Sequence, residues 1–330
     1  MKQAVFNRFG MPSKVIECIN VPNLKPPNDW EVTVDIMVAT VNPSDVSVLR
    51  GHYGTLPSKF PATTGLEASG RVAAVGRMVK DFAVGDRVIL VANNNWVQRR
   101  NIAASALQKI PDWLSYEQAA MVKVNAFCAQ LMLTSFGDLQ PGDYVIQNAP
   151  MSAVGQMIMV FAAAKGIKTI NVIRKEKTSD DIKKFGGDIA VLDGEVLSTR
   201  VSKLTGGTPI SVGLDAVAGD AVSRMADCLE DGATLVNYGM LSGQDCQLRP
   251  DQTIFRDIRL RGFWLRKVLS TKNLKERQAM FEDTFSIMEK KKVEFTVFDR
   301  YPIEQISTAI EASESEDRRG KVLILPNGEC

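Results

Sequence analysis

Residues 144–173 decide the fold, and they read YVIQNAPMSAVGQMIMVFAAAKGIKTINVI. The run from Tyr144 to Gln147 is short and apolar, which is typical of a buried strand. Residues 154–165 have the apolar pattern of a helix that ends at Gly166, and residues 169–173 form a second apolar run. The stretch therefore predicts a strand–helix–strand unit, which is the building block of a parallel sheet.

The same alternation continues towards the C-terminus. Short apolar runs predict further strands at 189–192, 212–214, 234–238 and 260–263, with polar or helical stretches between them. Strands that alternate with helices favour a doubly wound parallel sheet with helices on both faces. We place this α/β domain at residues 119–266.

The first 118 residues have a different character, because strand patterns and turn signals follow one another closely. Residues 31–41 alternate apolar and polar side chains, as a half-buried strand does, and Asn42-Pro43-Ser44-Asp45 has the composition of a turn. Glycine-bounded runs at 69–76 and 85–92 predict two more strands. This pattern indicates a separate β-rich domain over residues 1–118.

The last 64 or so residues, 267–330, are short for an independent domain. They contain an amphipathic helix pattern at 274–290 and a closing strand pattern at 321–325. We therefore predict that this segment packs back onto the first domain.

Composition sets outer limits on function. A chain of 330 residues suggests about two domains at roughly 150 residues each. Lys and Arg number 40 and Asp and Glu 38, a net charge of +2, which gives no general attraction to nucleic acid or to an anionic membrane. His52 is the single histidine, so a site that needs two histidines is excluded.

The cysteines indicate a reducing environment. Cys18, Cys128, Cys228, Cys246 and Cys330 are odd in number, widely spaced and without a CxxC pair, so a four-thiolate zinc site is not expected. No apolar stretch is long enough to span a bilayer, and the start of the chain has no signal-peptide pattern. We expect a cytoplasmic protein with no nucleic-acid or membrane partner.

The turn after the first strand of the α/β domain is rich in small residues. Ala149, Ser152, Ala153 and Gly155 let the backbone approach a ligand, and the helix that follows points its N-terminus at it. Free N–H groups and the helix dipole favour an anion such as a pyrophosphate. The turn is a degenerate relative of the dinucleotide fingerprint, and the alternative is an ordinary tight strand–helix turn.

Two cations follow the second strand of that domain. An NAD-specific fold usually places a carboxylate there to bind the ribose 2′-hydroxyl, whereas this chain has Arg174 and Lys175. Both can pair with a 2′-phosphate, so we predict that NADPH is the cofactor.

Several motifs together resemble the medium-chain dehydrogenase/reductase superfamily, and within it the zinc-free 2-enoyl thioester reductases of the mitochondrial trans-2-enoyl-CoA/acyl-carrier-protein type. The motifs are Asn42-Pro43-Ser44-Asp45, Gly51-His52-Tyr53-Gly54, residues 142–149, Gly155-Gln156 and Arg261-Gly262-Phe263-Trp264-Leu265. The resemblance implies a GroES-like β-rich catalytic domain joined to a Rossmann-type cofactor domain. It also implies a homodimer.

The resemblance carries a specific chemistry. Zinc enzymes of the superfamily have a Gly-His-Glu motif, but this chain has Gly65-Leu66-Glu67, and leucine cannot bind zinc. In the zinc-free reductases the tyrosine of Gly-x-Tyr-Gly, here Tyr53, hydrogen-bonds the thioester carbonyl and protonates the enolate. The implied reaction is reduction of the C=C bond of an enoyl thioester carried by CoA or by a carrier protein.

The resemblance also implies a set of cofactor-binding residues, although Glu176 stands where the family often has arginine. Tyr53 could instead only pack in its turn, and His52 is expected to face solvent or tune the pocket. The implied cofactor-binding residues are Asn125, Met151, Ser152, Ala153, Val154, Arg174, Lys175, Glu176, Tyr238, Gly239, Met240, Leu241, Phe263, Trp264, Leu265 and Lys321.

Two other functions stay open. One is a zinc-independent quinone or enone reductase of the same superfamily, and the other is a non-catalytic NADPH-binding protein that has kept the fold. The presence of Tyr53 argues against the second.

Overall fold

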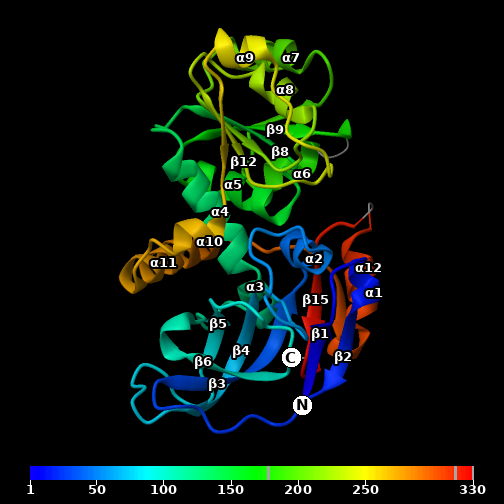
Figure 1. Cartoon of the computed structure of the whole chain (residues 1–330). Coiled ribbons are helices and arrows are strands. Elements are labelled where there is room, and N and C mark those ends of the chain that lie inside the picture. The colour runs from blue at the N-terminus through cyan, green and yellow to red at the C-terminus, as the bar shows by residue number, and fades with distance from the viewer. Residues whose placement is uncertain (177–178, 316–317, 329–330) are drawn as a thin grey trace. The chain divides into compact units, whose positions relative to one another are not determined.

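The computed structural model of the chain describes residues 1–176, 179–315 and 318–328. The chain forms two compact units, which Figure 1 shows with their elements labelled. Unit 1 comprises Met1–Val124 and Glu294–Cys330, and unit 2 comprises Asn125–Val293. Helix α4 (Val122–Ser135) begins in the first unit and continues into the second.

Unit 2 is built on a six-stranded sheet with the order β10-β9-β8-β11-β12-β13, in which neighbouring strands run parallel. The strands are β8 (Tyr144–Asn148), β9 (Lys168–Ile173), β10 (Ile189–Leu192), β11 (Val212–Asp215), β12 (Thr234–Asn237) and β13 (Arg259–Gly262). The chain places β9 and β10 on one side of β8 and the three later strands on the other. This order confirms the predicted doubly wound parallel sheet.

Helices cover both faces of this sheet. Alternate residues of β9 divide between two apolar clusters, so that Ile170 and Val172 pack with helices α7 and α8 while Ile173 packs with α5 and α6. That division follows from the two-residue period of a strand. The helices are α5 (Ala153–Ala164), α6 (Ser179–Lys184), α7 (Leu197–Thr205), α8 (Ala221–Ala226), α9 (Pro250–Ile254), α10 (Leu265–Leu269) and α11 (Leu274–Lys291).

Unit 1 is mainly β-structure. Its seven-stranded sheet has the order β14-β15-β3-β4-β5-β7, with β6 paired to β3, and strands β1 and β2 form a separate antiparallel pair. The strands are β1 (Lys2–Phe6), β2 (Ile16–Asn20), β3 (Glu31–Thr40), β4 (Ala68–Val75), β5 (Arg87–Leu90), β6 (Arg99–Ala103), β7 (Leu107–Lys109), β14 (Val297–Pro302) and β15 (Lys321–Leu325). The predicted strands at 31–41, 69–76 and 85–92 thus occur as β3, β4 and β5.

Short helices connect these strands: α1 (Pro12–Val15), α2 (Pro43–Arg50), α3 (Tyr116–Ala120) and α12 (Ile306–Ser313), with single 3₁₀ turns at Ala104–Ala106 and Ile303–Gln305. The turn predicted at residues 42–45 is wrong, because these residues begin helix α2. Asn42 is the N-cap and Pro43 the first helical residue, and the Asn42 N–H donates to the Asp45 carboxylate over 3.0 Å. The same residue types favour turns and helix N-termini, so composition alone does not separate the two.

The C-terminal segment divides between the units. Residues 294–330 belong to unit 1, whereas α11 belongs to unit 2, so the unit boundaries differ from those expected at residues 118 and 266. In unit 2 the Phe281 ring lies 4.6 Å from that of Phe127, and Gln130 donates to Asp283 over 2.5 Å. These contacts give the apolar face of α11 a partner on α4.

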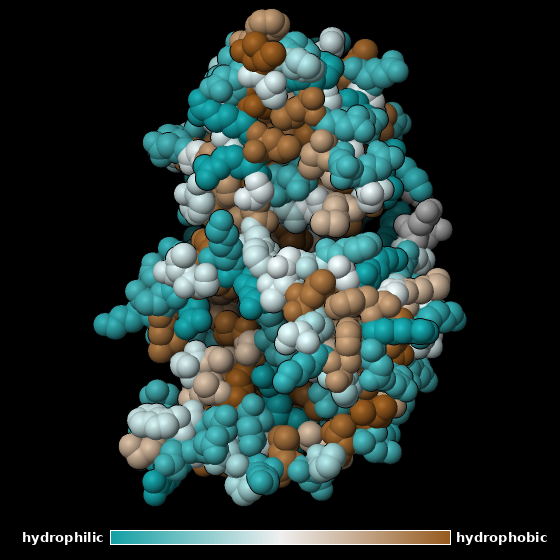
Figure 2. All heavy atoms as spheres, in the orientation of Figure 1, coloured by the Kyte–Doolittle hydropathy of each residue, from teal (hydrophilic) through white to brown (hydrophobic). Residues whose placement is uncertain are grey.

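The face of the molecule that Figure 2 shows is mainly hydrophilic, with small groups of apolar side chains. One such group lies over α9, where Ile254 and Phe255 are 69% and 80% exposed. Within the described residues, no helix has the length and apolarity that crossing a membrane requires. Cys18, Cys128, Cys228 and Cys246 form no disulfide within the described residues, and Cys330 lies outside them.

Candidate functional site

The turn between β8 and α5 allows a close backbone approach. Ser152 is the N-cap of α5, and its Oγ accepts from the Gly155 N–H over 3.1 Å. Ala149 has a positive φ of 49°, and a Cβ on Gly155 would lie only 2.6 Å from the Ala149 carbonyl oxygen. A side chain at position 155 would therefore force the turn open. The N-terminus of a 12-residue helix and this narrow turn suit a bound phosphate.

Tyr238 follows β12 and has a buried hydroxyl. That hydroxyl finds no hydrogen-bond partner among the described residues. Burial raises the pKa of Tyr238 well above its ordinary value, and the Ser152 side chain only partly opposes the change. The group is therefore a neutral donor at physiological pH, and it lies beside the Ser152 side chain at the start of α5.

The cations after β9 stand in solvent. Arg174, Lys175 and Glu176 are exposed, and neither cation forms an ion pair with another described residue. Their position after Ile173, the last residue of β9, is where a parallel sheet of this kind binds the adenosine ribose. The side chains are thus available for a 2′-phosphate.

The remaining predicted residues of unit 2 differ in exposure. Asn125 in α4 is buried, with 1% of its surface exposed, whereas Met240 and Leu241 are 61% and 57% exposed. Phe263 is buried, and its ring meets that of Phe136 edge-on at 6.1 Å between centroids. Trp264 and Leu265 are half-buried, as are Met151, Ser152, Ala153 and Val154 of the phosphate turn.

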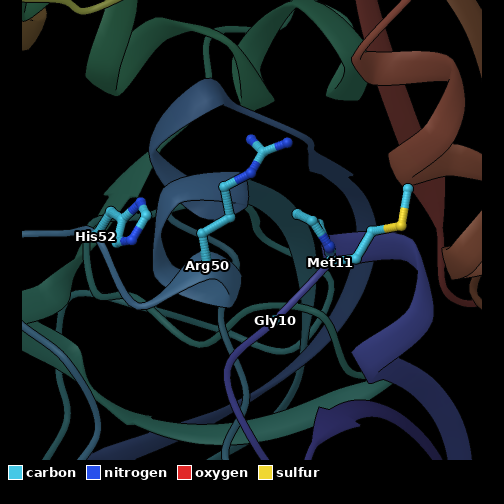
Figure 3. A pocket seen from close by; sticks show the side chains of 5 residues that line it. Gly10, Met11, Arg50 and His52 are labelled. Carbon is cyan, nitrogen blue, oxygen red and sulfur yellow. The ribbon is translucent and has the colours of Figure 1, made fainter. Parts of the chain in front are cut away.

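Tyr53 and His52 lie in unit 1, directly after α2. Tyr53 is half-buried against the apolar core of that unit. His52 is exposed and lines an open hollow of about 370 Å³ with Gly10, Met11, Pro12 and Arg50. In the view of Figure 3 the Arg50 side chain lies between those of His52 and Met11. The expectation that His52 faces solvent agrees with this placement.

A buried group of charged side chains lies in unit 1. Asp45 is completely buried, and its carboxylate accepts from the N–H groups of Asn42, Gly65 and Leu66 and from the Thr64 hydroxyl, at 2.9–3.0 Å. Burial nevertheless raises the pKa of Asp45 above its ordinary value. Four donors offset most of the cost of removing a carboxylate from water.

Glu67, Lys123 and Lys321 complete this group, which we call the buried charge cluster together with Asp45. Glu67 is fully buried; one carboxylate oxygen accepts from the Val124 N–H over 2.9 Å, and Oε2 has no hydrogen-bond partner among the described residues. Burial raises the pKa of Glu67 to about 7, against the opposing effect of Lys321 and Lys123. Lys321 donates to Asn42, and Lys123 donates to the carbonyl of Leu66 and, over 2.9 Å, to that of Val91.

Sequence reasoning did not find the acidic members or Lys123 of this cluster. It assigned Lys321 to the cofactor, whereas the structure shows its ammonium donating to Asn42 within unit 1. Four ionisable residues spread from 45 to 321 give no local pattern, so only the fold brings them together. Sequence reasoning also missed three polar residues that end strands, namely Asn148, Asp215 and Asn237. The signal that could have revealed them is a polar side chain directly after an apolar run.

Comparison with known proteins agrees with this architecture. The family model of the alcohol dehydrogenase GroES-like domain matches residues 28–127, and that of the zinc-binding dehydrogenases matches residues 153–282. The mitochondrial enoyl-acyl-carrier-protein reductase of Rattus norvegicus is 33% identical over 321 residues, which are 95% of this chain and 85% of the relative. The chain belongs to the enoyl-acyl-carrier-protein reductase family of the medium-chain dehydrogenase/reductases.

Solved structures share the fold of this reductase family member. The Escherichia coli quinone oxidoreductase in complex with NADPH has a TM-score of 0.86 at 24% identity, covering 99% of this chain and all of the other. The heterodimeric mitochondrial 2-enoyl thioester reductase of Candida tropicalis has a TM-score of 0.86 at 23% identity, covering 98% and 99% of the two chains. The predicted GroES-like and Rossmann-type architecture and the predicted family are confirmed.

This reductase does not fit the zinc that one of the family descriptions names. Leu66 stands at the position of the histidine in the Gly-His-Glu motif of the zinc enzymes. The neighbouring Glu67 lies near the lysines of the buried charge cluster. In the described part of the chain, no group of three or more His, Cys, Asp or Glu side chains is placed to hold a metal ion. Two ammonium groups beside the carboxylates disfavour a divalent cation there.

Proposed function

We propose that this protein reduces the C=C bond of a 2-enoyl thioester with NADPH. The observation that carries the proposal is the relationship, over 95% of the chain, to a relative named for enoyl-acyl-carrier-protein reduction. A thioester makes the β-carbon of the conjugated double bond electrophilic. Addition of a hydride there needs no metal, provided that a donor stabilises the charge that develops on the carbonyl oxygen.

Tyr53 is the group that we assign to this oxygen. Its phenol can hydrogen-bond the thioester carbonyl and pass a proton to the substrate after hydride addition. Packing against the apolar core of unit 1 limits the orientations of the ring. Asn125, which is buried in α4, is assigned to order either the cofactor ribose or this tyrosine.

The residues of unit 2 support NADPH as the partner of this reaction. When bound, NADPH supplies the hydride. The N–H groups at the start of α5 and the Ser152 turn would hold the pyrophosphate, and the Tyr238 hydroxyl adds a neutral donor near this turn. Arg174 and Lys175 would pair with the 2′-phosphate, which NADH lacks. Gly239, Met240 and Leu241 then border the other half of the dinucleotide.

Four further residues are assigned from the resemblance, and their roles stay proposals. Phe263, Trp264 and Leu265 are assigned to line the nicotinamide and acyl groups. In the structure the Phe263 ring packs edge-on against the Phe136 ring. Lys321 is assigned to the cofactor as well, and its ammonium, which has three N–H donors, gives one of them to Asn42.

A quinone reductase is the second candidate function, because the fold of the Escherichia coli quinone oxidoreductase matches this chain over 99% of its length. Steady-state assays with crotonyl-CoA and with a simple quinone, each with NADPH and NADH, separate the candidates. We expect turnover of crotonyl-CoA with NADPH and a kcat/KM for the quinone lower by at least about tenfold. Turnover of the quinone alone would refute the proposal, and binding of NADPH without turnover of either substrate would indicate a non-catalytic protein.

We further propose a homodimer that pairs strand β13 of two copies. β13 is the last strand of the sheet of unit 2, and its four residues are exposed. An unpaired edge strand offers N–H and C=O groups to a second chain. Light scattering should give twice the mass of 36.2 kDa. Leu260→Pro should give the monomer, because the Leu260 N–H lies on the side of β13 that faces away from β12 and proline removes this donor. A monomeric wild type would contradict this.

The cytoplasmic location is likewise a proposal, supported by the cysteines, which form no disulfide within the described residues. The curated relatives are named as mitochondrial. Cell fractionation of the natural protein against markers of both compartments decides between them.

A further inference from the structure

Three neighbouring parallel strands of unit 2 end in polar side chains that bond to one another. Asn148 ends β8, Asp215 ends β11 and Asn237 ends β12. The Asp215 carboxylate accepts from the side-chain amide of Asn148 over 2.5 Å and from that of Asn237 over 2.7 Å. Asp215 is completely buried. A buried carboxylate therefore ties three strands together at the edge where an open parallel sheet binds its ligand.

The same carboxylate fixes the loop that follows β11. Its oxygens accept from the N–H groups of Val217 at 3.1 Å and Ala218 at 3.0 Å, while the Asn148 side-chain oxygen accepts from the Ala216 N–H at 2.7 Å. Every group that faces Asp215 in these contacts is a donor. An asparagine at this position would turn one amide NH₂ towards those donors and lose at least one of the bonds.

The loop after β11 is joined in turn to the loop after β12. The N–H groups of Leu241 and Ser242 donate to the carbonyls of Ala216 and Val217, over 3.1 Å and 2.9 Å. Asn237 uses its amide to bridge Asp215 and the Gly239 carbonyl, the latter over 2.7 Å. The two loops touch so closely that a Cβ on Gly239 would lie 2.6 Å from the Ala216 carbonyl oxygen. Asp215 thus holds the loop 238–242 through the loop 216–218.

This held loop presents apolar side chains to solvent. Met240 and Leu241 are 61% and 57% exposed although their backbone is fixed by the bonds above. The strand order places this loop on the far side of β8 from β9. In such a sheet the adenosine half of a dinucleotide lies over the end of β9, so the nicotinamide half extends over β11 and β12.

We propose that Asp215 is a positioning residue for the nicotinamide half of the cofactor. It keeps the loop 238–242 in the one arrangement that places Met240 and Leu241 against that half. The inference rests on the proposed binding of NADPH, but not on the proposed reduction of an enoyl thioester. It assigns Asp215 no contact with the cofactor itself.

The test compares two ligands that share the adenosine half. Dissociation constants of NADPH and of adenosine 2′,5′-bisphosphate are measured by calorimetry on the full chain, for the wild type and for Asp215→Asn. The bisphosphate has no nicotinamide, so its affinity should change by less than about twofold, whereas the Kd of NADPH should rise by at least about tenfold. A rise that is equal for both ligands, or an unchanged Kd for NADPH, overturns the proposal.

Two further variants separate positioning from loss of stability. Thr169→Val removes a buried hydroxyl at the opposite end of the same sheet, where it accepts from Asn171 over 3.0 Å, and should leave both dissociation constants unchanged. Asn237→Ser is a milder change of the same network and should repeat the NADPH-selective effect if Asp215→Asn does not fold. An effect of Thr169→Val equal to that of the network variants overturns the proposal.

Binding and turnover are scored separately. A wild type that binds NADPH but reduces no enoyl thioester refutes the proposed function and leaves this inference to be decided by the two dissociation constants. A wild type that does not bind NADPH overturns both.

Discussion

Replacing Glu67 by glutamine should change how the stability of the protein depends on pH. The Glu67 carboxyl is fully buried in unit 1, and its pKa rises from an ordinary 4.5 to about 7 because burial disfavours the charged form. The unfolded chain releases this proton near the ordinary value, whereas the folded chain keeps it up to about pH 7. The contribution of Glu67 to the free energy of unfolding is therefore fully present below the pKa that the group has in the unfolded chain. This contribution is lost as the pH rises through the pKa that the group has in the folded chain.

The structure sets the size of this effect. A pKa that rises from 4.5 to about 7 on folding, at about 1.4 kcal/mol per pKa unit, lowers the free energy of unfolding by about 3 kcal/mol across that range. The side-chain amide that Glu67→Gln introduces does not titrate, so this part of the pH dependence should vanish in the variant. Relative to the wild type, Glu67→Gln should gain about 3 kcal/mol between about pH 5 and about pH 8.

Urea unfolding at a series of pH values measures the difference directly. Glu230→Gln removes an exposed carboxyl outside the buried charge cluster and is the matched control, which should follow the wild-type profile. A stability difference between Glu67→Gln and the wild type that is independent of pH would refute the reasoning. A difference of opposite sign would show that Lys123 and Lys321 dominate over burial and keep Glu67 ionised.

Three further predictions concern activity. Tyr53→Phe should lower kcat on an enoyl thioester by at least about a hundredfold, because the variant loses a donor aimed at the charge that develops on the carbonyl oxygen. The Kd of NADPH, measured by calorimetry, should stay within about twofold of the wild-type value. A variant that keeps more than about half of the wild-type kcat would assign the role to another residue, with Asn125 as the first candidate. Replacing Arg174 and Lys175 together by Ala should lower the ratio of kcat/KM for NADPH to that for NADH by at least about a hundredfold, since two charge-assisted contacts of about one decade or more each disappear. Equal use of both cofactors by the wild type would contradict the 2′-phosphate assignment. EDTA should leave activity unchanged and metal analysis should find no stoichiometric zinc, because Leu66 occupies a ligand position; one tightly bound zinc per chain would refute this.

Local patterns predicted most of the sheet of unit 2. Strands β8 to β12 contain short apolar runs between polar stretches, and such runs in alternation with helices have few other arrangements. The helix α5 and its small-residue turn were visible for the same reason. By contrast, the composition of residues 42–45 predicts a turn where the chain begins a helix, because a helix N-terminus uses the same residue types.

Local sequence patterns do not predict contacts between residues that lie far apart in the chain. The unit to which α11 belongs depends on which surface its apolar face meets, and Phe281 meets Phe127 in unit 2. The buried charge cluster joins residues 45, 67, 123 and 321, and nothing in a local window marks a charged side chain as buried. The Asp215 network lies at the ends of three strands, so its geometry depends on the strand order.

The fate of the transferred hydride tests the central claim most directly. Wild-type protein is given crotonyl-CoA and NADPH that carries deuterium at the reactive position of nicotinamide C4, and the product is analysed by mass spectrometry and NMR. Direct reduction of the enoyl thioester places a single deuterium at the β-carbon of butyryl-CoA and takes the α-proton from a group that exchanges with solvent, as Tyr53 does. Saturated product without deuterium at the β-carbon, or oxidation of NADPH without saturated product, would contradict the account.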